Sequence, residues 1–575
     1  MSTVQAQPRP TVPDGLATDP EARLSALAEG LRRLEARVDA LEGRAVPAAA
    51  AAPSQASAAE AVVALPETSS LLGLAGRVCL ILGGATLIRA LVDAGTLPRG
   101  GGVALGLAYA LAWALLADRA PSGPAAAFRG LASILIAYPL LVESTTRFGI
   151  LPPGTAAFLL VLVTGLHAAA AWRRDLPALL WTAVLASLGS GFIMMAAARA
   201  VIPFTAAFLA LGLGALWLTY GRRWHGLRWP TALAADLSVL ILTALAAWPG
   251  GPPEGYRDLS PRGAMALALA LPVAYIGSFA VRMLQRRRVL NPFEGVQTAL
   301  VLLVGFGGAL RVALASGAGT GLLGLGVSLA GLGCYAAALP FAADQEETRA
   351  NFNFFTFLAL IFLLLGGPIV LPAPAFALVS AALGLAAMGF ALRLRRAVLL
   401  LQCGLYLAAS AVASGLAADA YRAFLDPRGP EPPAPAALAT LAALGGALVL
   451  FLLRLPPAAG LARMRPALLL LGAMAAAGFG ALAVLGLGAP FAREAAVLAA
   501  ARTAVLSALA IALAALGQRL PALGLGWLVY PLLALATLKF LLEDLAVGRP
   551  LTLFLAFMCI GTTLILSPRL LKVNR

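Results

Sequence analysis

The chain has 575 residues, of which 61% are hydrophobic and only 12% charged, and its mean hydropathy is +0.90. Soluble domains carry about 25% charged residues, so this composition excludes a soluble enzyme, a secreted disulfide scaffold and a disordered chain. The net charge of +16 comes from basic residues scattered between apolar runs, without the one-sided cluster of a nucleic-acid-binding surface. The sequence therefore predicts an all-α, polytopic transmembrane helix bundle that binds no nucleic acid.

The N-terminal arm differs in composition from the rest of the chain. We expect residues 1–17 to be disordered, residues 18–44 to form a helix that Thr18 and Glu21 open as a capping box, and the Ala/Pro/Ser-rich residues 45–70 to be a flexible linker. Apolar residues recur in this helix at alternating steps of three and four: Leu24, Leu27, Leu31, Leu34, Val38 and Leu41. That heptad pattern predicts a coiled coil pairing protomers or a partner helix. The alternative, a helix lying on the bilayer, is less compatible with its nearly balanced acids and bases.

Residues 71–567 contain eighteen apolar segments, each near the roughly 20 residues that a helix needs to span a bilayer. In chain order they are Leu71–Val92, Gly101–Ala117, Pro124–Thr145, Pro153–Trp172, Leu176–Ala197, Ile202–Tyr220, Trp229–Trp248, Gly263–Leu284, Phe293–Ser316, Gly319–Ala343, Asn351–Leu371, Ala373–Leu392, Ala397–Ala418, Ala436–Leu453, Pro466–Leu487, Ala495–Leu516, Ala522–Leu542 and Leu551–Ser567. We expect kinks at Pro139, Pro272 and Pro531.

The distribution of basic residues predicts the orientation of the bundle. If the N-terminal arm is cytoplasmic, the connections on that side hold more than twice as many arginines and lysines as the outer ones. This favours an inner (plasma) membrane protein with both termini in the cytoplasm, the C-terminal one as a tail over residues 568–575. The two longest connections, Pro249–Arg262 and Asp419–Pro435, would then lie outside.

Metal-binding residues are scarce. The four cysteines fall inside apolar segments without metal-ligand spacing: Cys79, Cys334, Cys403 and Cys559. The sequence has two histidines, His167 and His225. This pattern does not support a haem, zinc or histidine-based di-iron site, so we expect no metal and no cofactor.

Ionisable residues inside the apolar segments are the candidate functional residues, because charges in a bilayer are costly. Asp93 follows Arg89 by four residues, and Glu543 follows Lys539 by four, so each acid shares a helix face with its cation. Arg502 has no acid at that spacing. The predicted ligand-binding set is Arg89, Asp93, Arg311, Arg502, Lys539 and Glu543, and Asp236 is a possible proton or polar site.

Two interpretations of these charges are open. In the first, they form self-neutralising pairs near helix ends, such as Glu143 with Arg147, and their long side chains reach the interface. In the second, cations in the outer half of the membrane converge and bind an anionic headgroup or solute. Arg502 favours the second interpretation most. Asp236 either carries protons or hydrogen-bonds a neighbouring helix, and His167 is interpreted as a structural hydrogen-bond donor.

The first and last hairpins share an order of features: a cation, an acid one turn later, an outer arginine and a returning helix. Over Ala536–Arg549, and more weakly over Leu71–Gly106, the chain resembles a family of bacterial membrane proteins of unknown function. Members of that family have an N-terminal coiled coil, a Pro/Ala linker and a long series of transmembrane helices. The resemblance implies this architecture and an inner-membrane location, but no activity and no catalytic residues.

Three functions are compatible with the sequence. The leading hypothesis is a non-enzymatic membrane protein that binds or transports an anionic lipid-like or envelope-precursor molecule. The second is a membrane scaffold that assembles partners through its coiled coil. The third is an intramembrane lipid-linked transferase, which would need catalytic acids from the two longest outer connections.

Overall fold

The structure is a computed structural model, and it describes residues 29, 83–222, 224–342, 349–426, 431–454, 458–488 and 494–572. The chain divides into two compact units, Met1–Leu80 and Ile81–Arg575. Of the first unit only Glu29, an exposed helical residue, is described. Apart from Glu29, the predicted disordered segment, coiled coil and linker therefore lie outside the described residues and stay predictions.

Every regular element in the described part of the second unit is a helix. After a helix over residues 83–93, the α-helices are α3 (Arg99–Asp118), α4 (Gly123–Thr146), α5 (Pro153–Arg174), α6 (Pro177–Ala197), α7 (Val201–Gly221), α8 (Arg228–Ala246), α9 (Pro261–Arg286), α10 (Pro292–Val301), α11 (Gly307–Ser316), α12 (Thr320–Ala338), α13 (Arg349–Val370), α14 (Ala373–Leu394), α15 (Ala397–Ala413), α16 (Leu416–Leu425), α17 (Pro435–Leu453), α18 (Ala458–Gly488), α19 (Ala495–Arg519), α20 (Val529–Lys539), α21 (Leu545–Val547) and α22 (Pro550–Lys572). Two π-helical turns, η2 (Leu302–Phe306) and η8 (Phe540–Asp544), join α10 to α11 and α20 to α21.

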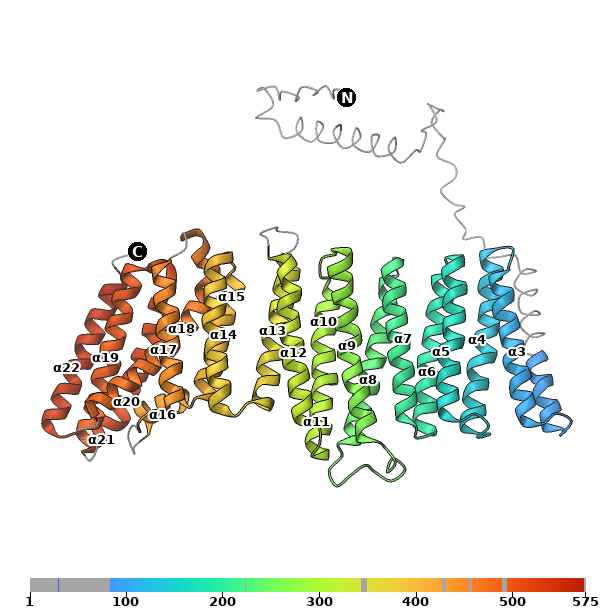
Figure 1. The fold of residues 1–575 in the computed structure, drawn as a ribbon, viewed down its shortest axis with the longest axis horizontal. Helices are drawn as coiled ribbons and strands as arrows, with labels where there is room; N and C mark the ends of the chain where they lie inside the picture. Colours follow the sequence, from blue (N-terminus) through green and yellow to red (C-terminus); the bar gives the residue numbers. More distant parts are fainter. Residues whose placement is uncertain are drawn as a thin grey trace, which may run out of the picture. The chain divides into compact units, whose positions relative to one another are not determined.

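Successive helices pack as hairpins, as α3 with α4, α12 with α13 and α14 with α15 (Figure 1). Helices that are separated in the chain also pack, as α14 does with α17, and α19 contacts α22, which follows α20 and α21 in sequence. Prolines begin many of these helices, including α5, α6, α9 and α17, where the missing N–H has no intrahelical partner to lose.

Sixteen helices within the described residues are long and apolar enough to cross a membrane, and each coincides with a predicted segment to within a few residues. The bent pair α15 and α16 would be a seventeenth span. Of the remaining predicted segment, Leu71–Val92, only the last part is described, and it is helical. The chain is therefore a multi-pass membrane protein by the length and composition of its helices, whereas the orientation of its termini stays a prediction.

One predicted span is wrong in detail. Instead of a continuous helix over Ala397–Ala418 followed by an outer connection, the chain bends by 69° between α15 and α16. Gly415 lies at the bend with φ +86°, a left-handed conformation that ends a right-handed helix and that glycine adopts without steric penalty. The helix then restarts and runs to Leu425, so part of the expected loop is helical. At the C-terminus, α22 runs through Pro568 to Lys572, so the first residues of the tail predicted over 568–575 are helical.

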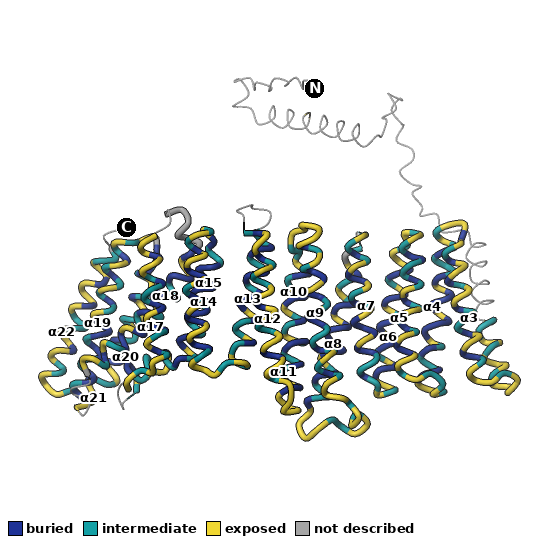
Figure 2. The backbone as a smooth tube through the Cα atoms, viewed as in Figure 1, coloured by how far each residue is buried: buried dark blue, intermediate teal, exposed yellow. Residues whose placement is uncertain are grey.

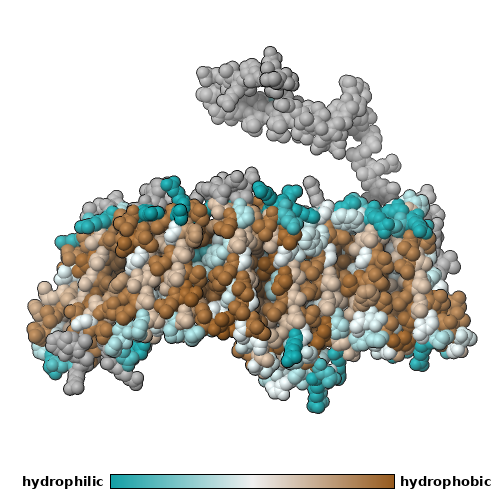
Figure 3. Space-filling view, viewed as in Figure 1, coloured by the Kyte–Doolittle hydropathy of each residue, from teal (hydrophilic) through white to brown (hydrophobic). Residues whose placement is uncertain are grey.

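The exposed surface of the bundle is apolar. Large side chains such as Leu322 (79% exposed), Leu303 (73%) and Val273 (71%) project outward, while the buried residues follow the contacts between helices (Figure 2). The space-filling view shows hydrophobic residues across the height of the helices and hydrophilic ones at both ends (Figure 3). In water such a surface would drive aggregation, whereas in a bilayer it contacts acyl chains at no such cost.

Candidate functional site

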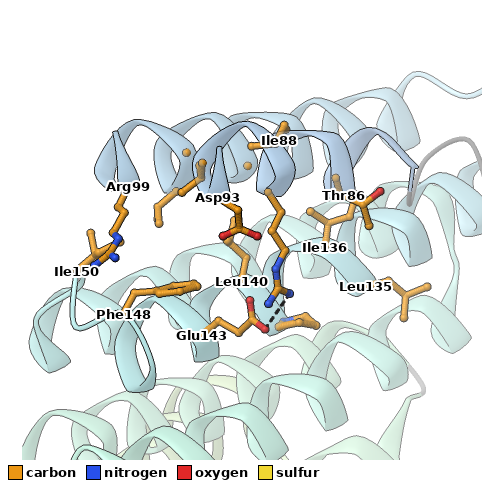
Figure 4. Close-up of a pocket in the computed structure, with 17 residues that line it drawn as sticks. Thr86, Ile88, Asp93, Arg99, Leu135, Ile136, Leu140, Glu143, Phe148 and Ile150 are labelled. Atoms are coloured by element: carbon orange, nitrogen blue, oxygen red, sulfur yellow. Dashed lines mark hydrogen bonds and ion pairs between the residues drawn. The ribbon is translucent and has the colours of Figure 1, made fainter. Parts of the chain in front are cut away.

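A cavity of about 200 Å³ lies between the helix over residues 83–93 and the helices α3 and α4. Its walls are mainly aliphatic and include Ile88, Ile136 and Leu140. Figure 4 shows Asp93 on the first helix and Glu143 on α4 both pointing into the space between these helices. An apolar cavity with a few charged groups is the usual form of a small-ligand site.

Four charged side chains line this cavity: Arg89, Asp93, Arg99 and Glu143. Nη1 of Arg89 donates to Oε1 of Glu143 at 3.2 Å, and the Arg89 side chain is 49% exposed. Asp93 and Arg99 make no hydrogen bond or ion pair with the part of the chain that the structure describes. The cavity therefore offers one accessible ion pair together with a carboxylate and a guanidinium that are both free to meet a ligand.

The expected pairing within single helices is wrong here. Arg89 bonds Glu143, 54 residues away, and not Asp93 on its own helix. Arg147, predicted to pair with Glu143, lies instead over the ring of Phe148 at 5.7 Å from the ring centroid. The reason is that the helix over residues 83–93 lies beside α4, which brings Arg89 to the carboxylate of Glu143. Spacing along a single helix cannot predict a partner on another helix.

Arg502 lies in α19 and is only 1% exposed. Its Nε donates to the backbone oxygen of Ala423 at 2.7 Å, and Nη2 donates to the backbone oxygens of Asp426 at 2.5 Å and Arg422 at 3.3 Å. Its Nη1 donates to Oε1 of Glu543 at 2.7 Å. The guanidinium therefore satisfies the carbonyl groups of Ala423 and Asp426 at the C-terminal end of α16, which no further helical turn can satisfy.

Lys539 at the end of α20 is similarly enclosed. Nζ donates to Oγ1 of Thr503 and to Oδ2 of Asp544, both at 2.9 Å, as well as to the backbone oxygen of Ala499. It also pairs with Oε2 of Glu543 at 3.4 Å, the contact that the four-residue spacing predicted. Thr503 in turn donates to Oδ2 of Asp544 at 2.7 Å.

We refer to Arg502, Thr503, Lys539, Glu543 and Asp544 as the α19–η8 ion cluster. In this cluster two cations face two carboxylates. Each of the three guanidinium nitrogen atoms of Arg502 donates a hydrogen bond to a protein oxygen. Buried charges are tolerated when they are paired and hydrogen-bonded in this way. As folded, the cluster has the form of a closed structural network.

Asp236 in α8 is buried, and Gln297 is its one hydrogen-bonded partner in the part of the chain that the structure describes. Nε2 of Gln297 in α10 donates to its two carboxylate oxygens at 3.0 and 2.9 Å. Both side chains are nearly inaccessible, with 4% of Asp236 and 1% of Gln297 exposed. Asp236 therefore accepts hydrogen bonds from a neighbouring helix, which is one of the two interpretations of this residue from the sequence.

The remaining candidates lie apart from these groups. Arg311 in α11 is exposed and makes no hydrogen bond or ion pair with the described residues. Nδ1 of His167 contacts the backbone oxygen of Val163 at 2.8 Å within α5. The candidate residues thus fall into separate places along the helices of the second unit and do not converge on one site (Figure 1).

Glu294 is a buried acid that, like Asp544, was missed from the sequence. Glu294 in α10 is fully buried and accepts hydrogen bonds from Tyr220 at 2.8 Å and from Arg282 at 2.5 Å. It also forms a capping box with Asn291. The signal was present, because an asparagine followed three residues later by a glutamate marks a helix start.

No group of three or more His, Cys, Asp or Glu residues that could hold a metal ion occurs among the described residues. No protein-family model, curated protein sequence or solved structure matches the chain. The resemblance based on Ala536–Arg549 therefore stays a prediction, and function rests on the geometry of the sites alone.

Proposed function

We propose that this membrane protein binds an amphipathic, lipid-like molecule in the cavity between residues 83–93, α3 and α4. The observation that carries the proposal is the combination of an apolar wall with charged groups that still have bonding capacity. Acyl or isoprenoid chains suit the aliphatic wall, and an ionised headgroup suits the charged end. The proposal concerns binding, and it assigns no reaction.

The charges favour a headgroup with two kinds of polar group. Arg99 is available to an anionic group such as phosphate, for which a guanidinium is a suitable partner. Asp93 accepts hydrogen bonds from hydroxyl or ammonium groups of the same ligand. A phosphate-bearing headgroup that also carries such donors would satisfy both residues, and Arg89 could exchange Glu143 for the ligand.

The α19–η8 ion cluster is a less suitable ligand site than the cavity. Its cations are the most buried of the predicted ligand-binding residues, yet their nitrogen atoms already face protein oxygens. A ligand entering there would have to replace hydrogen bonds that stabilise the end of α16. The scaffold alternative depends on residues 18–44, which lie outside the described residues.

Native mass spectrometry of the gently extracted chain, without added ligand, tests the proposal. We expect a retained amphipathic molecule whose occupancy falls about tenfold in an Asp93→Asn/Arg99→Gln variant, because a hydrogen bond to a charged group is worth about 1.5–3 kcal/mol. A Leu135→Trp variant, which narrows the cavity without changing its charge, should also lose the ligand.

Arg262→Gln is the matched control, because Arg262 is an exposed arginine at the start of α9 that does not line the cavity. This variant should keep the ligand. A chain that carries no ligand, or one whose ligand persists in both cavity variants, would rule out this site.

A further inference from the structure

A second groove, of about 460 Å³, lies between α14 and α17. Its α14 wall includes Ala386, Gly389, Phe390 and Leu392, and Leu450 contributes from α17. Two arginines, Arg393 and Arg454, line the same groove. It shares no residue with the cavity beside α3 and α4.

The helical repeat explains why these residues line one groove. Positions 386, 389, 390 and 393 are separated by three or four residues, so they occupy one face of α14. Leu450 and Arg454 are four residues apart on α17. Arg393 lies in the last turn of α14, and Arg454 directly follows α17. The groove therefore joins an apolar face to a pair of guanidinium groups at the C-terminal ends of two helices.

The two guanidinium groups have no counter-charge among the described residues. Neither Arg393 nor Arg454 makes a hydrogen bond or ion pair with the residues that the structure describes, and both are exposed. The adjoining stretches of sequence, residues 393–396 and 454–465, contain arginines but no aspartate or glutamate. A guanidinium pair with free donors suits the oxygens of a phosphate.

The walls indicate that the anion carries an apolar part. Phe390 is 55% exposed and Leu450 is 41% exposed, so the groove continues as an apolar surface below the arginines. A Cβ atom built on Gly389 would meet nothing within 4 Å, which shows that space is open beside the α14 backbone. An acyl chain fits such a surface, so an anion that carries one can contact the arginines and the apolar wall together.

We propose that the groove between α14 and α17 binds one anionic phospholipid, with its phosphate between Arg393 and Arg454 and an acyl chain along Gly389 and Phe390. Basic pockets between transmembrane helices are known to hold anionic headgroups in this way. The lipid comes from the leaflet at which α14 and α17 end, which the distribution of basic residues predicts to be the cytoplasmic one.

The test uses the full chain in a zwitterionic detergent, titrated with dioleoylphosphatidylglycerol or dioleoylphosphatidylcholine and followed by native mass spectrometry. We expect a preference for phosphatidylglycerol that an Arg393→Gln/Arg454→Gln variant weakens about tenfold or more, since each guanidinium near an anionic headgroup contributes. Arg393→Lys/Arg454→Lys keeps both charges and should retain most of the binding. Gly389→Leu keeps both arginines but fills the groove, so it should weaken binding as well.

The control is Arg119→Gln/Arg519→Gln, which removes the same charge from two exposed arginines at the ends of other helices, α3 and α19. This variant should bind like the original chain. The proposal is overturned by equal binding of the two lipids, by equal losses in control and groove variants, or by glycerol phosphate alone competing as strongly as the whole lipid. The last result would identify a site for a soluble anion. Thermal unfolding of each variant separates loss of binding from loss of fold.

Discussion

Arg502 and Glu543 form an ion pair of 2.7 Å between α19 and η8, in which the guanidinium is 1% exposed and the carboxylate 28%. The same guanidinium holds the carbonyl groups at the end of α16. One side chain therefore connects three elements that are distant in sequence and stabilises the C-terminal end of α16. This relationship explains why an arginine without an acid on its own helix is tolerated in a membrane span.

Replacing Arg502 should destabilise the fold strongly. Arg502→Leu leaves the carbonyl oxygens of Ala423 and Asp426 without their donor and removes one partner of Glu543. We expect the free energy of unfolding to fall by about 3–5 kcal/mol, the usual loss when one partner of a buried ion pair is removed. Unfolding by sodium dodecyl sulfate in mixed micelles measures it. Arg519→Gln, at an exposed helix end, should change it by less than about 0.5 kcal/mol; equal effects of the two changes would contradict the assigned role.

Lys539 and Asp544 should be energetically coupled. Their 2.9 Å contact is almost completely buried, with side chains 2% and 3% exposed. In a double-mutant cycle with Lys539→Met and Asp544→Asn we expect a coupling energy of about 1–3 kcal/mol. The exposed pair Arg549 and Glu494, at 3.3 Å and 71% and 49% exposed, is the control and should couple by less than about 1 kcal/mol. A buried pair that couples no more strongly than the exposed one would show that the cluster adds nothing to stability.

The two members of the Asp236–Gln297 contact should respond differently to substitution. Gln297→Leu leaves the buried carboxylate without its donor, so we expect a loss of about 1–3 kcal/mol. Asp236→Asn removes the charge and still allows an amide hydrogen bond, so its effect should be smaller. Thermal unfolding of both variants checks the order, and the double variant Asp236→Leu/Gln297→Leu should recover part of the loss. A larger effect of Asp236→Asn would indicate that the charge itself is required.

Two glycines on α12 allow a matched test of helix packing. A Cβ atom added at Gly324 would lie 2.7 Å from Cβ of Ile369 on α13, whereas one at Gly326 would meet nothing within 4 Å. We expect Gly324→Ala to destabilise the chain by about 1–3 kcal/mol because the hairpin must separate. Gly326→Ala should be neutral or slightly stabilising, since alanine favours the helix. Thermal unfolding distinguishes the two, and similar shifts would contradict a close approach at Gly324.

Spacing in the sequence predicted some partners of the candidate site residues and missed others. Periodicity along one helix predicted the contact of Lys539 with Glu543, which the structure has at 3.4 Å. The same reasoning assigned Arg89 to Asp93 and gave Arg502 no partner, whereas their bonded acids lie 54 and 41 residues away. Asp544 was missed because the π-helical turn η8 shifts the side chains relative to a regular α-helix.

The sequence by itself determined the class of protein, the positions of the apolar helices and the residues that carry charge among them. These properties depend on hydropathy and on the length of chain needed to cross a bilayer, both of which are local. Only the tertiary structure decided which charges meet, where the span after Ala397 bends, and where cavities remain. Those features depend on the packing of helices that are far apart in the chain, and a small shift of one helix against another changes every partner across the contact.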